Sequence, residues 1–265
     1  MQVAVVGHVE WVEFARVDHM PSPGEIVHAQ ERWEEPGGGG AVAAVQLARL
    51  AGQASLLTVL GDDELGRRAG ERLAELGVEV HAARPREPQR RAFVHLDGAG
   101  ERTITVLGDK LVPRGDDDGL PWHELRDAEA VLFVSGDVAA LRRARRARIL
   151  VASARELPTL QRGGVVLDAL VGSGEDEGER YRPGELDPAP HLVVTTAGAL
   201  GGWAQPGGPY RAASVPGPVE DAYGCGDCFS AGLAYALGRG LEREEALALA
   251  ARCGAAALAR RGAHG

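Results

Sequence analysis

Asparagine is absent from the 265 residues, lysine occurs once, and cysteine occurs three times. Three cysteines are too few for a disulfide scaffold, and the opening segment "MQVAVVGHVEW" lacks the basic and apolar regions of a secretory signal, so we expect a cytoplasmic protein. No apolar run reaches the roughly 18–20 residues that a membrane span needs. The net charge of −9 argues against nucleic acid or an anionic membrane as a partner.

Short apolar segments alternate with helical segments along most of the chain. We expect buried strands at 2–8, 54–61, 130–137, 148–153, 164–170 and 191–198, and helices at 36–52, 62–77, 226–238 and 242–260. This order predicts an α/β fold with a mostly parallel central sheet and right-handed crossovers. Segments at about 9–35 and 88–108 instead alternate apolar and polar residues, which predicts a small second sheet. The acidic stretch 171–190 is expected to be an exposed loop.

The stretch "VEDAYGCGDCFSAGLAYALGRG" (219–240) places a glycine turn before an apolar helix. Backbone N–H groups at such a turn, together with the helix N-terminus, favour anions, and glycines let a phosphate approach the backbone. A carboxylate at Asp227 would repel a bound phosphate, but it suits a base that takes a proton from a hydroxyl attacking that phosphate. The alternative is an ordinary helix N-cap aspartate among flexible glycines.

Four segments in order resemble the ribokinase-like (PfkB) family of carbohydrate and nucleoside kinases, and the resemblance runs from residue 2 to about 263. "DAYGCGDCFSAGLAYAL" resembles the C-terminal family signature, and "PGGGGAVAAVQLARLAG" resembles the Gly-Gly stretch that opens a helix. "TTAGALGG" (195–202) resembles the nucleotide-binding turn, and "MPSPGEIV" (20–27) the lid. The resemblance implies a ribokinase-like three-layer sandwich, a single domain over 1–265, with a β-sheet lid formed by about 9–35 and 88–108.

The resemblance also implies roles for particular positions. Asp227 would be the catalytic base, and the backbone of Gly224, Cys225 and Gly226 would form an anion hole for the transferred phosphate. Adenine-nucleotide contacts would come from Thr196, Gly198 and Gly201, and acceptor contacts from Gly37, Gly38 and Gly39. ATP and Mg²⁺ would be the cofactors, a sugar or nucleoside the partner, and the lid could pair two chains in a homodimer.

Departures from the family cluster at the acceptor side. Where members carry an Asn and an Asp two residues apart after the first strand, this chain has Glu10 and Val12. Glu10 could replace the missing sugar contact, because residues two apart share a strand face; alternatively it is a solvated lid charge. Trp11 and Trp33 could face a flat or apolar substrate, or they could be ordinary lid packing.

The family's Asn-Glu motif, which supports magnesium through water, is also missing. Its region holds "GSGEDEGER", where Glu175, Asp176, Glu177 or Glu179 could organise the ion. The sequence does not choose among them. Because Mg²⁺ keeps several waters and is held largely by phosphates, it can arrive with ATP.

Two further features each have two interpretations. Cys225 and Cys228 could form a redox switch, because a thiol at a helix N-terminus can have a lowered pKa, or they could be two small residues in a reducing compartment. Arg90 and Arg91, on an expected lid strand, could bind a phosphorylated substrate or lie on the surface. The eight histidines show no metal or nucleophile spacing and receive no role.

These observations predict an ATP-dependent kinase that phosphorylates a sugar or nucleoside hydroxyl, with Asp227 as base. A non-catalytic nucleotide- or sugar-binding protein on the same fold is the alternative, favoured by the lost polar residues. A dinucleotide-dependent oxidoreductase fits poorly, because "GGGGA" does not directly follow the first strand and no spaced acid follows it.

Overall fold

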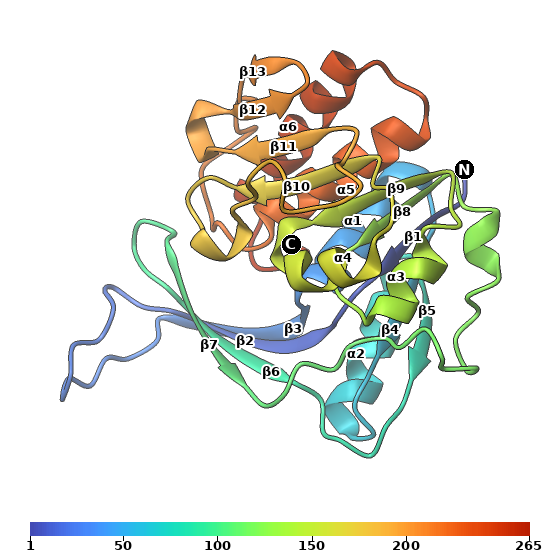
Figure 1. Ribbon diagram of the computed structural model, residues 1–265. Coiled ribbons are helices and arrows are strands. Elements are labelled where there is room, and N and C mark those ends of the chain that lie inside the picture. The colour runs from blue at the N-terminus through green and yellow to red at the C-terminus, as the bar shows by residue number, and fades with distance from the viewer.

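The computed structural model describes residues 1–265 (Figure 1). Seven parallel strands form most of a nine-stranded sheet in the order β13-β12-β11-β10-β9-β8-β1-β4-β5. The parallel strands are β1 (Val3–Val6), β4 (Ala54–Val59), β5 (Val78–Ala83), β8 (Ala130–Phe133), β9 (Ile149–Ser153), β10 (Ala169–Ser173) and β11 (Val193–Thr196). At one edge β12 (Gly202–Gln205) and β13 (Gly208–Tyr210) pair antiparallel.

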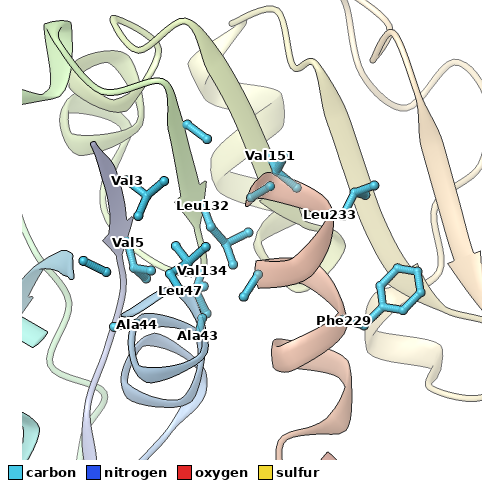
Figure 2. Packing of buried hydrophobic residues seen from close by; sticks show 14 of the residues in the cluster. Val3, Val5, Ala43, Ala44, Leu47, Leu132, Val134, Val151, Phe229 and Leu233 are labelled. Atoms are coloured by element: carbon cyan, nitrogen blue, oxygen red, sulfur yellow. The ribbon is translucent and has the colours of Figure 1, made fainter. Parts of the chain in front are cut away.

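Helices cover both faces of this sheet, and the alternation of β1 shows why. Val3 and Val5 point to the face covered by α1 (Gly39–Ala51), α2 (Glu64–Glu75), α5 (Cys225–Gly238) and α6 (Arg243–Leu258), as Figure 2 shows for α1 and α5. Ala4 and Val6 point to the opposite face, under α3 (Val138–Ala144) and α4 (Leu157–Gly163). Successive strand residues face opposite sides, so one apolar run supplies two cores. The predicted three-layer α/β sandwich is confirmed.

A separate four-stranded sheet extends from the side of this core (Figure 1). Its order is β3-β2-β6-β7, with β2 (Glu10–Arg16), β3 (Glu31–Gly37), β6 (Arg91–Leu96) and β7 (Arg102–Leu107). Its apolar side chains pack on Val42 of α1 and on Tyr223, whereas β7 is exposed along its whole length. These strands fall in the segments where the sequence predicts a second sheet, apart from the end of β3. That they act as a lid, and that the chain is one domain, remain predictions.

The two tryptophans of this small sheet are covered by other side chains. Trp11 is buried beneath the guanidinium of Arg68, which lies 4.4 Å from the ring centre. Trp33 stacks on Phe14 at 4.9 Å and carries Arg261 on its other face at 4.1 Å. The packing interpretation of both residues is therefore the one that the structure supports.

The expected boundaries fail around 164–173. Helix α4 ends at Gly163, and Gly164 follows in the left-handed conformation (φ 58°), so the strand predicted at 164–170 begins only at Ala169. It continues to Ser173, so the first residues of the predicted exposed loop are instead strand residues beside β11. No helix combines the length and the apolar character needed to cross a membrane.

Candidate active site

A cavity of about 230 Å³ opens where the carboxyl ends of five parallel strands meet the N-termini of α1 and α5. Ser153 ends β9 and Thr196 ends β11, while His8 and Val134 follow β1 and β8. Strand β7 of the small sheet contributes Arg102 and Ile104 from the other side. Ligands of open parallel sheets bind at this edge, because the strand ends and helix N-termini converge there.

Asp227 lies in this cavity, in the first turn of α5. Burial raises the pKa of its carboxyl to about 6, and the negative charge of Glu179 adds to the rise, while Arg102 and Arg155 oppose it. A carboxylate with a pKa near working pH can take up a proton and remain largely ionised beforehand. The site therefore contains a group suited to general-base chemistry.

Backbone donors surround that carboxylate. Gly224 adopts the left-handed conformation (φ 75°) that starts α5, and the N–H groups of Cys225, Gly226 and Asp227 have no acceptor within the protein. The first N–H groups of a helix point outward along its axis and carry partial positive charge. The second helix, α1, begins at Gly39 beside the same space. The arrangement can hold an anion next to Asp227.

Most of the sequence-predicted residues meet here. Asp227, Gly224, Gly226, Thr196, Glu10, Gly38 and Gly39 line the cavity together. Four others do not line it: Gly37, Cys225, Gly198 and Gly201. Gly37 packs against Tyr223, since a Cβ there would lie 2.7 Å from the Tyr223 hydroxyl. Gly198 and Gly201 begin and follow the exposed turn after β11.

One end of the cavity is formed by His8, Glu10 and the glycines before α1. Glu10 is buried, and burial raises its pKa, although the charges of Arg90 and Lys110 act in the opposite direction. Arg90 Nε lies 3.0 Å from Glu10 Oε1. This ion pair engages one of the two arginines considered for a phosphorylated substrate. The other, Arg91, pairs with Glu13 on the small sheet outside the cavity.

The opposite end contains one of the four acids considered for magnesium. Glu179 lines the cavity and accepts hydrogen bonds from Arg155, whose Nη2 and Nε lie 2.6 and 3.0 Å from Glu179 Oε1. Arg155 also binds Asp176 at 2.6 Å. No three potential ligands gather into a cation site. A single carboxylate is consistent with Mg²⁺ that is carried by phosphates and water, but not with a dedicated metal cage.

The two cysteines of the turn do not have activated thiols. Burial raises the pKa of both, that of Cys228 to about 12. The Cys225 thiol donates a hydrogen bond to the Ala222 carbonyl oxygen at 2.8 Å. Desolvation disfavours the thiolate here more than the helix N-terminus favours it. The lowered pKa on which a redox switch depends is therefore absent.

Sequence reasoning missed several residues that line the cavity, among them His8, Arg102, Arg155 and Tyr223. Arg102 is the lining cation with no carboxylate within ion-pair distance; its guanidinium donates to the Ala222 carbonyl oxygen. His8 stands two residues before Glu10, directly after the glycine that ends the first strand segment, and that adjacency was the available signal. No local pattern marks Arg102, because it reaches the cavity only through the pairing of β7 with β6.

Comparison with known proteins agrees with this architecture. Residues 1–148 and 169–265 match the model of a protein family described as "pfkB family carbohydrate kinase". An ATP-dependent ribose-1-phosphate kinase of Halopiger xanaduensis is 28% identical over 99% of this chain and 94% of its own. A putative ribokinase from Agrobacterium tumefaciens superimposes with a TM-score of 0.82 at 22% identity, covering 98% of this chain and 92% of its own.

A third similar protein carries ligands. The ribokinase of Arabidopsis thaliana, in complex with ribose and ATP, has a TM-score of 0.72 at 21% identity and covers 98% of this chain and 93% of its own. At these identities the structures establish the ribokinase-like fold, and the family match includes all the lining residues except Ser153 and Arg155. The chain therefore belongs to the pfkB family of carbohydrate kinases.

Proposed function

We propose that the protein transfers the γ-phosphoryl group of ATP to a hydroxyl of a sugar or nucleoside, with Asp227 as general base. The observation that carries the proposal is the position of Asp227, a carboxylate with a pKa of about 6 beside the unpaired N–H groups that start α5. The carboxylate accepts the proton of the attacking hydroxyl. The hydroxyl oxygen bonds to the γ-phosphorus as the bond to ADP breaks.

The anion hole consists of the backbone of Gly224, Cys225 and Gly226. Its N–H groups are fixed before the reaction, so they stabilise the charge on the transferred group without reorganising, at about 3–4 kcal/mol for a good donor. The side chain of Cys225 is turned away to Ala222 and takes no part. When bound, Mg²⁺ neutralises charge on the ATP phosphates, and Glu179 is the residue that would support it through water.

The two ends of the cavity receive the two substrates. Thr196 lines the nucleotide end, and the turn carrying Gly198 and Gly201 follows it outside the cavity. Glu10, Gly38 and Gly39 line the acceptor end, and Gly37 precedes the two glycines without lining the cavity. The small sheet acts as a lid that excludes water, which would otherwise compete as phosphoryl acceptor, and its exposed edge strand β7 could join two chains as a homodimer.

The acceptor class that fits best is a phosphorylated pentose. Arg102 faces the cavity from β7 without a carboxylate partner, so its charge is available for a substrate phosphate. The relative from Halopiger xanaduensis carries the name of a ribose-1-phosphate kinase. Arg90 and Arg91 are unsuited to this role because Glu10 and Glu13 already balance them.

The test is ADP release from Mg-ATP in the presence of ribose 1-phosphate, ribose, other sugars and nucleosides, with Asp227→Asn in parallel. Turnover that depends on one acceptor and is lost in Asp227→Asn, with ATP still bound, supports the proposal. If ATP or an acceptor binds but none of the acceptors turns over, the alternative of a non-catalytic binding protein replaces it.

The acceptor class is tested by Arg102→Gln with Arg91→Gln as its control, because both arginines belong to adjacent strands of the small sheet. Arg102→Gln should raise KM for ribose 1-phosphate about 10–100-fold and leave KM for unphosphorylated acceptors nearly unchanged. Arg91→Gln should change neither. An equal rise in KM for phosphorylated and unphosphorylated acceptors would show that Arg102 does not bind a substrate phosphate.

A further inference from the structure

His8 and Glu10 carry polar groups that face the cavity and have no partner there. The two side chains are 13% and 10% exposed and line the cavity beside Gly38. His8 Nε2 lies 3.9 Å from Glu10 Oε1, which is too far for a hydrogen bond. No protein group donates a hydrogen bond to the Glu10 carboxylate, although Glu10 is only 7% exposed as a residue.

The imidazole of His8 is held from behind. Its Nδ1 lies 3.1 Å from the hydroxyl of Ser135, a fully buried residue that follows β8, and its carbonyl oxygen accepts the N–H of Gly40 at 3.1 Å. Burial lowers the pKa of His8 far below its ordinary value, and the charges of Lys110, Arg90 and Arg155 lower it further, so the ring is neutral. The negative charge of Glu10, on the Nε2 side of the ring, favours the tautomer with the proton on Nε2. In that tautomer Nδ1 is an acceptor, and the Ser135 hydroxyl donates to it.

The charge of the Glu10 carboxylate is neutralised by Arg90, although Arg90 donates no hydrogen bond to it. Arg90 Nε lies 3.0 Å from Oε1, but it points so that no hydrogen bond forms. Arg90 therefore supplies charge, while the Glu10 oxygens keep their lone pairs for a donor in the cavity. Glu10 lines the cavity, so a ligand hydroxyl there can donate to a carboxylate that no protein group satisfies.

We propose that His8 and Glu10 together bind one hydroxyl group of the acceptor, accepting its proton at Glu10 and donating to its oxygen from His8 Nε2. The distance of 3.9 Å between His8 Nε2 and Glu10 Oε1 leaves room for such a hydroxyl. A hydroxyl oxygen about 2.8 Å from each of these two atoms would have an angle of roughly 90° between its two hydrogen bonds. This pair, the hydroxyl clamp, rests on the proposed function. It takes a hydroxyl other than the phosphorylated one, because a hydroxyl has one proton, and the attacking hydroxyl gives its proton to Asp227.

The clamp predicts which chemical groups the acceptor needs. A deoxy analogue leaves both Nε2–H and the carboxylate unpaired, and a fluorine can accept from His8 but cannot donate to Glu10. Sites built to hydrogen-bond a hydroxyl reject the analogue that lacks it by large factors. The specificity of this end of the cavity therefore depends on one hydroxyl that both donates and accepts.

The experiment compares the unmodified protein, His8→Phe and His8→Gln on ribose 1-phosphate and ribose and on their 2-deoxy and 3-deoxy counterparts. His8→Phe should lower kcat/KM at least about 100-fold with the hydroxylated acceptor, mainly through KM. The loss should shrink to about threefold or less on the one deoxy analogue that lacks the clamped hydroxyl. His8→Gln keeps an N–H donor and should restore part of the loss. His95→Phe, on strand β6 and outside the cavity, is the control and should change nothing.

Equal losses for His8→Phe on all acceptors, or no loss at all, would overturn the clamp while leaving the kinase proposal intact. Failure of the proposed function is recognised separately, as absence of acceptor-dependent turnover. In that case binding is followed without ATP through the imidazole resonances of His8. A shift with ribose or ribose 1-phosphate that is absent with one deoxy analogue supports the clamp, and no shift with any of these probes overturns it.

Discussion

The proposed acceptor end and the proposed nucleotide end of the cavity are built by different means. At the acceptor end His8 and Glu10 are nearly buried and held by Ser135, Arg90 and the backbone of Gly40. Next to the nucleotide end, outside the cavity, the short turn Gly198–Leu200 is exposed to solvent, and Leu200 is 86% exposed. The acceptor end thus contains two side chains held in place by their neighbours, whereas the turn after β11 offers exposed backbone.

The proposed function accounts for this difference through the ligand that each end would recognise. Fixed and desolvated polar groups lose little entropy on binding and penalise a ligand that lacks the matching hydroxyl. An exposed turn contributes less discrimination, because water serves its backbone groups equally well when no ligand is bound. We therefore expect acceptor choice to be sensitive to single atoms, and nucleotide binding to tolerate small changes.

The largest effect should come from a methyl group at the acceptor end. A Cβ at Gly39 would lie 2.7 Å from Asp227 Oδ1 and 2.7 Å from Val134 Cγ1. Gly39→Ala should lower kcat/KM about 100-fold, because the carboxylate of Asp227 must move, and a misplacement of about 1 Å at the reacting centre costs a factor of this order. Steady-state kinetics measure it, with thermal unfolding as the control for folding. Activity within tenfold of the unmodified protein would contradict the placement of Asp227 against α1.

The pH dependence of the reaction should report the ionisation of Asp227, a partly buried residue that is the proposed base. With the pKa of Asp227 near 6, kcat/KM should fall about tenfold for each pH unit below 6, because only the ionised carboxylate accepts a proton. A profile of kcat/KM between pH 4.5 and 8 measures it, with a coupling-enzyme control for acid sensitivity. If kcat/KM stays nearly constant down to pH 4.5, the carboxylate is better solvated than its position shows.

The same burial should make the ionised side chain of Asp227 destabilise the folded state at neutral pH. Because its pKa is raised, the folded state prefers the protonated acid, so the free energy of unfolding declines as the pH rises through about 6. Asp227→Asn should therefore stabilise the protein by about 1–3 kcal/mol at pH 8 and by nearly nothing at pH 4. Urea unfolding at both values measures it. If Asp227→Asn stabilises the protein equally at pH 8 and pH 4, the cause is a change in packing and not the loss of a charge.

A charge at the nucleotide end should tune the base at the centre. Glu179 raises the pKa of Asp227, so Glu179→Gln should move the acid limb of kcat/KM to lower pH. The shift should be less than about one unit, because burial is the larger cause. The pH at which kcat/KM begins to fall measures this shift, even if Glu179→Gln also lowers the maximum value of kcat/KM. Glu177→Gln, in the same segment but outside the cavity, is the control.

The fold was readable from the sequence because period-two and period-3.6 patterns report local burial. The paired apolar faces of β1 and the glycines before α1 and α5 predicted both the layers and the central position of Asp227. Boundaries failed where a glycine ended a helix, at Gly163 and Gly164, because glycine is compatible with a turn, a strand start or a helix end.

The rest of the site required the tertiary structure. His8 was visible beside Glu10, but the orientation of its ring depends on Ser135, which lies 127 positions away. Arg102 reaches the cavity through the pairing of two strands. The thiol chemistry of Cys225 was decided by burial, which outweighs the effect of the helix N-terminus. Long-range contacts and desolvation leave no mark on local sequence.

The smallest effect should come from the equivalent methyl group at the nucleotide end. Gly198 has φ of 50°, and the nearest atom to an added Cβ is Glu175 Oε1 at 3.4 Å, an ordinary contact with a flexible side chain. Gly198→Ala should raise KM for ATP about two- to fivefold, because the left-handed backbone costs alanine about 1 kcal/mol and the exposed turn can relax. It should leave kcat and KM for the acceptor unchanged. A loss comparable to that of Gly39→Ala would show that this turn is as rigidly fixed as the acceptor end.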